Sequence, residues 1–224
     1  MKTPFHTTLA VLLVATTLFS CSESETSSTE AIKKSKEGKV EKTVSAVSFP
    51  DGNYTIDSKY SSFGWEGKEA SGTSHTGDIQ IHKGSMSIMD NSFHTAFVGI
   101  NMGTINCTDL EGDAKSRLEQ HLKSADFFGS EKHQYSTLDV IAIKTKNGET
   151  KAVGTLTIKG ITKPVGFPAT LSLDGDNIVV DGTLVFDRSD FDVRFRSDKW
   201  YSDLGDKLIY NDIALNYHLV ARPS

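Results

Sequence analysis

Hydrophobic and polar residues alternate along most of the chain beyond residue 50, and this two-residue period predicts β-strands. The alternation is clearest at 96–102, 165–173 and 209–219, where apolar side chains recur at every second position except Asn211. Short segments of this kind, separated by Gly, Asn and Asp, lie at 54–57, 62–65, 77–82, 85–89, 96–102, 137–143, 152–158, 165–173, 178–186 and 209–219. Eight or more evenly spaced, half-apolar strands are typical of a closed antiparallel barrel or a sandwich.

Turns and one helix interrupt the predicted strands. A different period appears at 109–128, where Leu118, His121 and Leu122 are spaced as on one face of a helix, with Asp113 as its N-cap. We expect a single short helix that lies against the barrel or over its mouth. Dipeptides that favour tight hairpin turns are Asp51-Gly52, Asn147-Gly148 and Asp174-Gly175.

The N-terminus has the pattern of an export signal. Residues 1–20 carry one Lys, an apolar run at 9–15 and small residues before Cys21, a stretch too short to span a bilayer as a mature helix. Leu18-Phe19-Ser20-Cys21 resembles a bacterial lipobox, which implies lipidation of Cys21 at the mature N-terminus. The alternative is an ordinary signal peptide with a chance cysteine. Lipidation would place the protein in the bacterial cell envelope, facing the periplasm or on the outer-membrane surface.

The segment that follows Cys21 differs in composition from the rest of the chain. Residues 22–48 contain ten Ser or Thr, five Glu and five Lys, with no aromatic residue, so they bury too little apolar surface to offset the entropy of ordering. No comparable linker and no internal repeat interrupts the remainder. We therefore predict a signal peptide at 1–20, a flexible tether with lipidated Cys21 at 21–50, and one barrel domain at 51–224.

Composition and charge narrow the class of protein. The 224 residues are 37% hydrophobic and 24% charged, with a formal net charge of −5, which indicates a folded domain and argues against a nucleic-acid binder. The chain has two cysteines. If Cys21 is acylated, Cys107 has no partner for a disulfide and is predicted to be a small buried apolar group.

Motifs of enzymes and metal sites are missing from the sequence. It contains no Gly-x-Ser-x-Gly, phosphate-binding glycine loop, Cys-x-x-Cys or His-Glu-x-x-His pattern. The stretch 187–207 interleaves Asp with Lys and Arg, which favours a solvated rim hairpin over a calcium loop. We expect neither catalysis nor a bound metal. The histidines beyond the signal peptide show no close metal-ligand spacing. They are His75, His82, His94, His121, His133 and His218.

Four ordered blocks resemble the YceI-like family. They are Tyr54-Thr-Ile-Asp57, Leu118-x-x-His-Leu-Lys-Ser-x-Asp-Phe-Phe128, Gly154-Thr-Leu-Thr-Ile-Lys-Gly-Ile-Thr-Lys-Pro-Val165 and Arg188-Ser-Asp-Phe191. The similarity covers nearly all of 54–221. It implies an all-β fold, an antiparallel eight-stranded lipocalin-like barrel with one short helix. An internal apolar tunnel that binds polyisoprenoid-type lipids is implied by the resemblance as well.

The candidate ligand contacts combine the strand positions expected to face inward with the helix block. Ordinary core packing is the alternative for each inward residue. Phe127 and Phe128 could close one end of the tunnel and touch the lipid, or could anchor the helix to the barrel. The predicted contacts are Phe63, Trp65, Ile79, Met86, Val98, Ile100, Leu118, Leu122, Phe127, Phe128, Leu138, Leu156, Phe186 and Arg188.

Arg188 is the charged member of this set. It follows Phe186 on a strand and could point inward by parity, and a buried Arg requires polar partners. We expect a carboxylate partner, with Asp57, Asp187 and Asp190 as the candidates. A structural ion pair and a contact with a ligand head group are both open.

Three functions remain for this sequence. The first is a non-enzymatic carrier or sequestering protein for an isoprenoid or quinone-like lipid, held at a membrane by Cys21, with no other cofactor and no nucleic acid. The second is a fully packed barrel that binds a protein partner through its rim loops. The third is a hydrolase or redox enzyme without a known motif. Pairing of two barrels as a homodimer is left open.

Overall fold

The computed structural model describes residues 48–146 and 149–224, which form twelve strands, one α-helix and three 3₁₀ helices. The signal peptide, Cys21, most of the predicted tether and the Asn147-Gly148 turn lie outside the described residues. The strands are β1 (Gly52–Ile56), β2 (Ser62–Lys68), β3 (Ser74–Ile79), β4 (Ile81–Met89), β5 (Ser92–Asn101), β6 (Asn106–Cys107), β7 (Tyr135–Lys146), β8 (Glu149–Ile158), β9 (Ile161–Pro168), β10 (Thr170–Asp174), β11 (Asn177–Asp187) and β12 (Asp212–Pro223). The helices are η1 (Met102–Thr104), α1 (Gly112–Lys123), η2 (Arg188–Phe191) and η3 (Gly205–Lys207).

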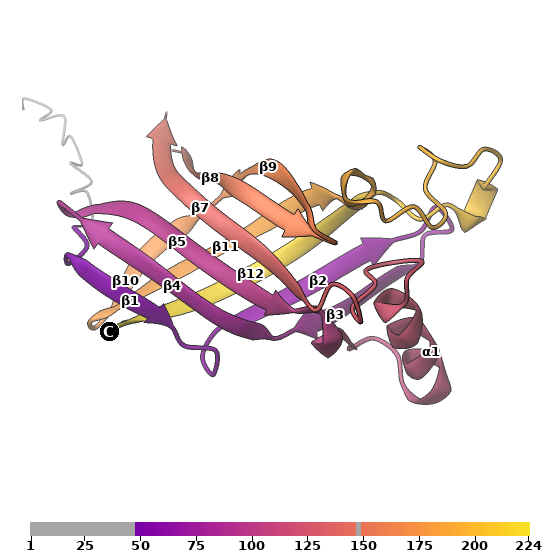
Figure 1. The fold of residues 1–224 in the computed structure, drawn as a ribbon, viewed down its shortest axis with the longest axis horizontal. Helices are drawn as coiled ribbons and strands as arrows, with labels where there is room; N and C mark the ends of the chain where they lie inside the picture. Colours follow the sequence, from indigo (N-terminus) through magenta and orange to yellow (C-terminus); the bar gives the residue numbers. More distant parts are fainter. Residues whose placement is uncertain (1–47, 147–148) are drawn as a thin grey trace, which may run out of the picture. The chain divides into compact units, whose positions relative to one another are not determined.

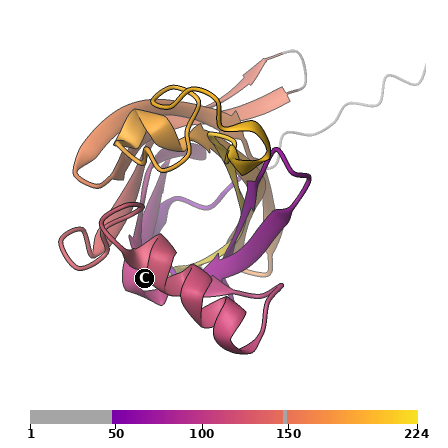
Figure 2. The ribbon, with the colours of Figure 1, turned by 90° about the vertical axis from the view of Figure 1, so that its right-hand side faces the viewer.

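The strands curve into an antiparallel barrel, so the predicted fold class is confirmed (Figures 1 and 2). The count of twelve strands exceeds the predicted eight because several barrel strands are interrupted. Successive strands β3 and β4 are separated only at Gln80, and β9 and β10 only at Ala169. Likewise β1 and β2 pair with different stretches of β12. If β1 and β2, β3 and β4, β5 and β6, and β9 and β10 are each counted as one interrupted barrel strand, the twelve segments occupy eight places around the barrel.

A side chain helps to close the barrel where the backbone ladder is incomplete. Strand β11 pairs with β10 and β12, so the ladder from β8 through β9 reaches β11 only by way of β10. The hydroxyl of buried Tyr217 donates to the Pro168 carbonyl at 2.6 Å. Its ring passes over Gly182, its register partner, where a Cβ would collide with the hydroxyl. Tyr217 thus links β12 to the end of β9 across β11.

Tight turns close the end of the barrel opposite α1. The predicted turn at Asp174-Gly175 joins β10 to β11, with Gly175 at φ +59°. Asp90 and Asn91 join β4 to β5 with φ of 53° and 56°, and the Asp51 carboxylate accepts both of their backbone N–H groups at 3.2 and 2.7 Å. The prediction of a hairpin at Asp51-Gly52 is wrong, because Gly52 begins β1 and Asp51 supports this neighbouring turn.

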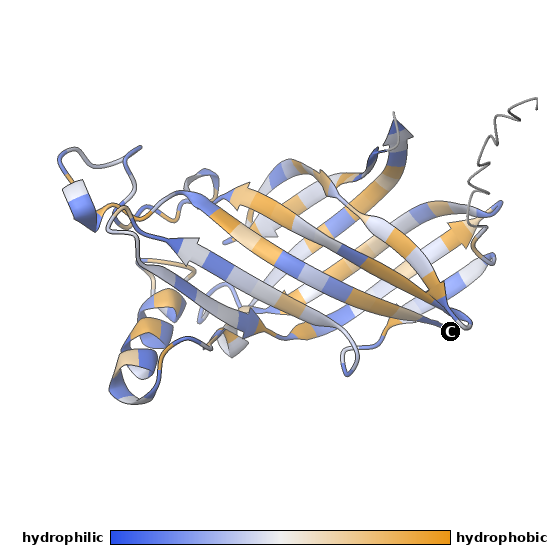
Figure 3. Cartoon of the chain, turned by 180° about the vertical axis from the view of Figure 1, so that it is seen from behind, coloured by the Kyte–Doolittle hydropathy of each residue, from blue (hydrophilic) through white to orange (hydrophobic). Residues whose placement is uncertain are grey.

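Alternation along the strands separates the core from the surface (Figure 3). Trp65 is half-buried, whereas the other side chains that parity places inward are buried. Cys107 is buried, as predicted, and forms no disulfide within the part of the chain that the structure describes. Burial raises the pKa of its thiol. The buried inward set comprises Phe63, Ile79, Ile81, Met86, Ile88, Val98, Ile100, Met102, Leu138, Val140, Leu156, Ile158, Leu184 and Phe186.

Helix α1 and the segment 187–211 lie at the other end of the barrel, on opposite sides of its rim (Figure 2). The predicted N-cap is wrong: Glu111 is the cap residue, without a side-chain hydrogen bond, and Asp113 lies in the first turn. A carboxylate there still favours the helix, since the N-terminal end of the helix dipole is positive. No helix within the described residues has the length and apolarity needed to cross a membrane.

The segment 187–207 is not the solvated rim hairpin that its charges predict. It contains η2 and η3, and its side chains Arg188, Phe191, Val193 and Ser197 are at most 2% exposed. The charge pattern gave a wrong prediction of solvation for the whole segment. Lys199 pairs with Asp187 and Asp190 at the surface, while the apolar residues between the charges pack inward. Only part of the segment is solvated.

Candidate functional site

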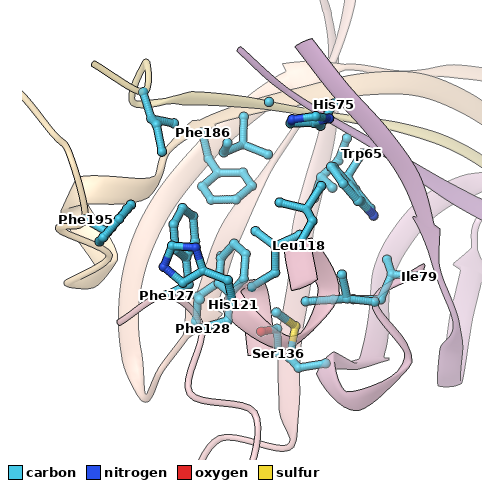
Figure 4. Close-up of a pocket in the computed structure, with 18 of the residues that line it drawn as sticks. Trp65, His75, Ile79, Leu118, His121, Phe127, Phe128, Ser136, Phe186 and Phe195 are labelled. Atoms are coloured by element: carbon cyan, nitrogen blue, oxygen red, sulfur yellow. The ribbon is translucent and has the colours of Figure 1, made fainter. Parts of the chain in front are cut away.

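An apolar cavity of about 280 Å³ lies at the α1 end of the barrel (Figure 4). It is bounded by β-strand side chains, by α1 and the turn after it, and by Phe195, Arg196 and Ile209 of the segment 187–211. The cavity brings together nine of the predicted contacts, which are Trp65, Ile79, Ile100, Leu118, Leu122, Phe127, Phe128, Leu156 and Phe186.

A second, smaller cavity of about 40 Å³ lies toward the opposite end of the barrel. Its lining includes Phe93 beside the β4–β5 turn, Phe167 and Tyr217. The structure therefore does not gather all predicted contacts at one site. The predicted contacts found here are Phe63, Met86, Val98 and Leu138.

The wall of the larger cavity depends on a close approach between β2 and β3. Trp65 lies opposite Gly77 in the register, and a Cβ at Gly77 would collide with the indole and with the Asn106 carbonyl. The indole Nε1 donates to the Asp78 carbonyl at 3.2 Å. The missing side chain at Gly77 thus lets the Trp65 ring lie flat as an apolar wall with its polar atom satisfied.

Helix α1 covers the cavity with one face and is tied to the barrel by a polar side chain. Leu118, His121 and Leu122 line the cavity, as their spacing predicts. The carboxylate of Glu119 accepts the backbone N–H of Cys107 at 2.9 Å, which joins the helix to β6. Lys115 donates to the Asn106 side-chain carbonyl at 2.8 Å. The helix is therefore positioned by its polar contacts while its apolar face closes the cavity.

Aromatic rings connect α1 to the segment 187–211. The His121 ring lies edge-on to Phe195 at 4.4 Å between centroids and to Phe127 at 5.2 Å. Phe128 packs on Phe127 at 5.8 Å, and its backbone N–H donates to the Leu122 carbonyl at 3.1 Å. Both rings line the cavity, and Phe127 also packs on Phe195 of the segment 187–211 at 5.9 Å. The anchoring role is thus seen in the structure, whereas contact with a lipid stays a prediction.

Arg188 is completely buried and stands behind this aromatic cluster. Its guanidinium donates to the carbonyls of Val193 and Ile209 at 2.9 Å and of Tyr210 at 3.2 Å. It also lies over the Phe127 ring, 5.4 Å from the centroid. Burial lowers the pKa of Arg188 to about 10, so the side chain is charged at neutral pH.

The prediction that a carboxylate binds Arg188 is wrong. Asp187 instead binds Lys199 at 2.6 Å, Asp57 binds Arg222 at 2.9 Å, and Asp190 lies 3.5 Å from Lys199. Main-chain carbonyls satisfy the guanidinium because the 3₁₀ turn and the irregular loop leave carbonyls without a strand partner. Arg188 is not among the cavity-lining side chains and braces Phe127 from behind.

Several lining residues were not predicted. Ile213 and Leu215 belong to an alternating strand of the sequence, and their parity could have identified them. Ile209 opens the alternating segment 209–219, although β12 itself begins only at Asp212. Phe195 comes from an irregular segment, where no period gives the direction of a side chain. The polar lining consists of Lys68, Glu69, His75, His121, Ser136 and Arg196, of which Ser136 is the buried one.

A hydrogen-bonded cluster stands beside the cavity at β3 and β6. The Asp109 carboxylate accepts from the Thr76 backbone N–H and contacts His75 Nδ1, both at 2.8 Å, and accepts from the Cys107 thiol at 3.2 Å. Although burial alone would raise it, these hydrogen bonds lower the pKa of Asp109 to about 2. The cluster fixes the chain that enters α1.

The geometry suits apolar binding more than chemistry on a bound molecule. Across 48–146 and 149–224, no group of three or more His, Cys, Asp or Glu side chains is placed to hold a metal ion. Among the polar lining groups, Lys68 is exposed and Ser136 is buried, while the others are partly exposed. The inner surface is aliphatic and aromatic, which is typical of pockets for apolar ligands.

Comparison with known proteins agrees with the fold. The YceI-like domain matches residues 54–221. Protein YceI of Escherichia coli O157:H7 is 36% identical over 74 residues, which are 33% of this chain and 38% of that relative. The chain thus spans less than two fifths of the length of the curated relatives it matches.

Solved structures show the same fold at low sequence identity. BcnA of Burkholderia cenocepacia is 21% identical with a TM-score of 0.61, over 74% of this chain and 98% of that one. A polyisoprenoid binding domain from Saccharophagus degradans is 12% identical with a TM-score of 0.56, over 76% and 98% of the two chains. Because the family match extends over most of the barrel, the chain belongs to the YceI-like family.

Proposed function

We propose that this protein binds the apolar chain of a prenyl-type lipid, such as an isoprenoid or a quinone, in the cavity beneath α1, and that it carries or sequesters this lipid without catalysis. The observation that carries the proposal is the 280 Å³ cavity whose buried lining side chains are all apolar except that of Ser136. The name of the Saccharophagus neighbour as a polyisoprenoid binding domain supports the choice of lipid.

The energetics of the cavity favour a hydrocarbon guest. Each methylene removed from water contributes about 0.8 kcal/mol, so the apolar length of the ligand would dominate its affinity. Its head group would remain near Lys68, His75 and Arg196, which line the cavity on the solvent side. These side chains orient the head group, while the apolar wall supplies most of the binding free energy.

Attachment to a membrane is the second part of the proposal. Lipidation of Cys21 would hold the barrel at the cell envelope through the tether at 22–50, and the basis for it is the sequence before Cys21. A Cys21→Ser variant expressed in a bacterial host should leave the membrane fraction, whereas the parent chain and a Cys107→Ser control should stay in it. Equal membrane association of all three proteins would refute the anchor.

Solvent extraction of the purified full-length protein, followed by mass spectrometry, tests lipid binding. We expect a prenyl lipid in near-stoichiometric amount, over and above any acyl chains released from Cys21. A barrel that yields no prenyl lipid and fails to take one up when it is added would contradict the proposal and favour a protein-interaction module.

A further inference from the structure

The two cavities of the barrel are lined by neighbouring positions of the same strands. On β2, Trp65 lines the larger cavity and Phe63 the smaller one, and on β5 the same division separates Ile100 from Val98. Successive side chains on one face of a strand are about 7 Å apart. The cavities therefore approach each other to within about the depth of one side chain.

Cross-strand pairs show the same division. Phe63 lies directly opposite Ile79 on β3, yet Phe63 lines the smaller cavity and Ile79 the larger. Leu138 and Leu156 are paired between β7 and β8 and are likewise divided between the two cavities. A single layer of side chains thus separates the cavities on both sides of the barrel.

Leu184 fills this layer on β11. It is 2% exposed, and it lines neither of the two cavities. Its register partner on β12 is Leu215, which lines the larger cavity, and its next neighbour on the same face of β11 is Phe186, which does so too. On the same face of β11, Leu184 therefore lies between Phe186, which lines the larger cavity, and Val180, which lines the smaller one.

Phe63 fills the layer on β2 and is held from behind. It is 2% exposed, and its ring lies 6.0 Å from the ring of Tyr217. Tyr217 is itself fixed by its hydrogen bond to Pro168 and by its packing on Phe167 at 5.9 Å. Movement of Phe63 toward the smaller cavity would have to displace this anchored ring.

We infer that Phe63 and Leu184 form a partition that sets the length of the apolar chain that the protein accepts. This inference rests on the proposed function and specifies its ligand. A volume of 280 Å³ holds roughly nine groups of about 30 Å³, the share of one water molecule in the liquid and close to that of a methylene. The class of ligand is thus a chain with about two isoprene units buried, and any longer tail stays in solvent.

The length dependence of binding by the full-length protein tests the partition. Linear prenyl alcohols of two, three and four isoprene units are titrated against a bound polarity-sensitive naphthalene dye, and their displacement of the dye gives the affinity. For the parent chain we expect less than a threefold gain in affinity beyond two units. Phe63→Ala and Leu184→Ala join the cavities, so each should bind the three-unit alcohol at least tenfold more tightly than the parent chain does.

Phe93→Ala is the matched control, because Phe93 lines the smaller cavity beside the β4–β5 turn and is remote from the partition. Its length profile should equal that of the parent chain. If the affinity of the parent chain rises tenfold or more with each added isoprene unit, the partition is overturned and the proposed function stays intact. This outcome needs only the parent chain, so it can be read even if the alanine variants do not fold. Failure of the parent chain to bind any of the alcohols would overturn the proposed function itself, and the partition with it.

Discussion

The two ends of the barrel are made by the same strands but are closed by different means. At the end opposite α1, short turns such as Asp90-Asn91 join the strands, and Tyr217 ties β12 to β9 above a cavity of only 40 Å³. At the α1 end, the helix and the segment 187–211 close a cavity of 280 Å³. Side chains from the strands nearly fill the barrel at the first end, whereas a larger cavity remains at the end where α1 and the segment 187–211 lie.

The largest effect should come from removing the brace behind this roof. Arg188→Leu leaves the carbonyls of Val193, Ile209 and Tyr210 without their donor, which should lower the free energy of unfolding by about 3 kcal/mol or more. Urea unfolding measures this loss. Hydrogen exchange should be faster for the backbone amides of α1 and 187–211 than in the parent chain. The exchange rates in the β4–β5 and β10–β11 turns should stay unchanged. Arg194→Leu, at an exposed position, should cost under about 1 kcal/mol; equal costs for the two variants would contradict the bracing role.

A charge introduced into the roof should separate binding from folding. Leu122→Arg or Phe128→Asp places a charged group at the wall of the larger cavity, and we expect dye affinity to fall by about 2 kcal/mol or more, which is roughly thirtyfold. Circular dichroism checks that the barrel remains folded. Leu173→Arg is the matched control, since Leu173 is an exposed apolar residue at the opposite end. Unchanged affinity in folded Leu122→Arg would show that α1 does not cover the site.

The opposite end should respond to the loss of a single oxygen atom. Tyr217→Phe removes the hydrogen bond to Pro168 and keeps the ring, so we expect the free energy of unfolding to fall by about 1–2 kcal/mol. Dye binding in the larger cavity should stay within twofold of the parent value. Tyr210→Phe, at an exposed hydroxyl, is the control for the unfolding measurement. A Tyr217→Phe protein as stable as the parent would mean that the incomplete ladder needs no side-chain link.

Acid should loosen the α1 end through Asp109. Its pKa is lowered from 3.8 to about 2, so the folded state favours the charged carboxylate. The resulting stability is fully present above about pH 4 and is lost as the pH falls toward 2. Asp109→Asn should therefore flatten the decline of unfolding free energy in this window, by about 1 kcal/mol, in urea titrations at successive pH values. The control is Asp176→Asn, in the exposed β10–β11 turn, which should leave the acid decline of the unfolding free energy unchanged. If Asp176→Asn flattens this decline and Asp109→Asn does not, Asp109 is not the group that makes the fold sensitive to acid.

Local periods could predict the strands and the helix face over the cavity. The choice of a barrel over a sandwich, and the internal cavity, came from the resemblance to the YceI-like family. A period of two marks the inner face of each strand, and the spacing of Leu118 and Leu122 marks the helix face over the cavity. Periodicity gives the face of a residue but not its depth along the barrel. That is why Phe63 and Trp65, which share one face of β2, lie in different cavities.

The irregular segment could not be predicted for a different reason. Between Asp187 and Asn211 the partners of each group are set by tertiary contacts, so the sequence gives no signal that main-chain carbonyls satisfy Arg188 or that Phe195 packs on His121. Charged residues there suggested solvation, whereas neighbouring side chains are buried. The cavity-lining residues of the segment 187–211 are thus the least predictable part of the site.

The location of a bound prenyl chain is the most direct test of the account. The full-length protein is irradiated with a prenyl alcohol that carries a photoreactive diazirine at its tail, and the labelled residues are mapped by tandem mass spectrometry. We expect labels on side chains that line the larger cavity, such as Leu118, Phe128 and Phe186, and less labelling when unmodified prenyl alcohol competes. Labels confined to the turns opposite α1, or labelling that the unmodified alcohol does not reduce, would show that the prenyl chain does not bind in this cavity.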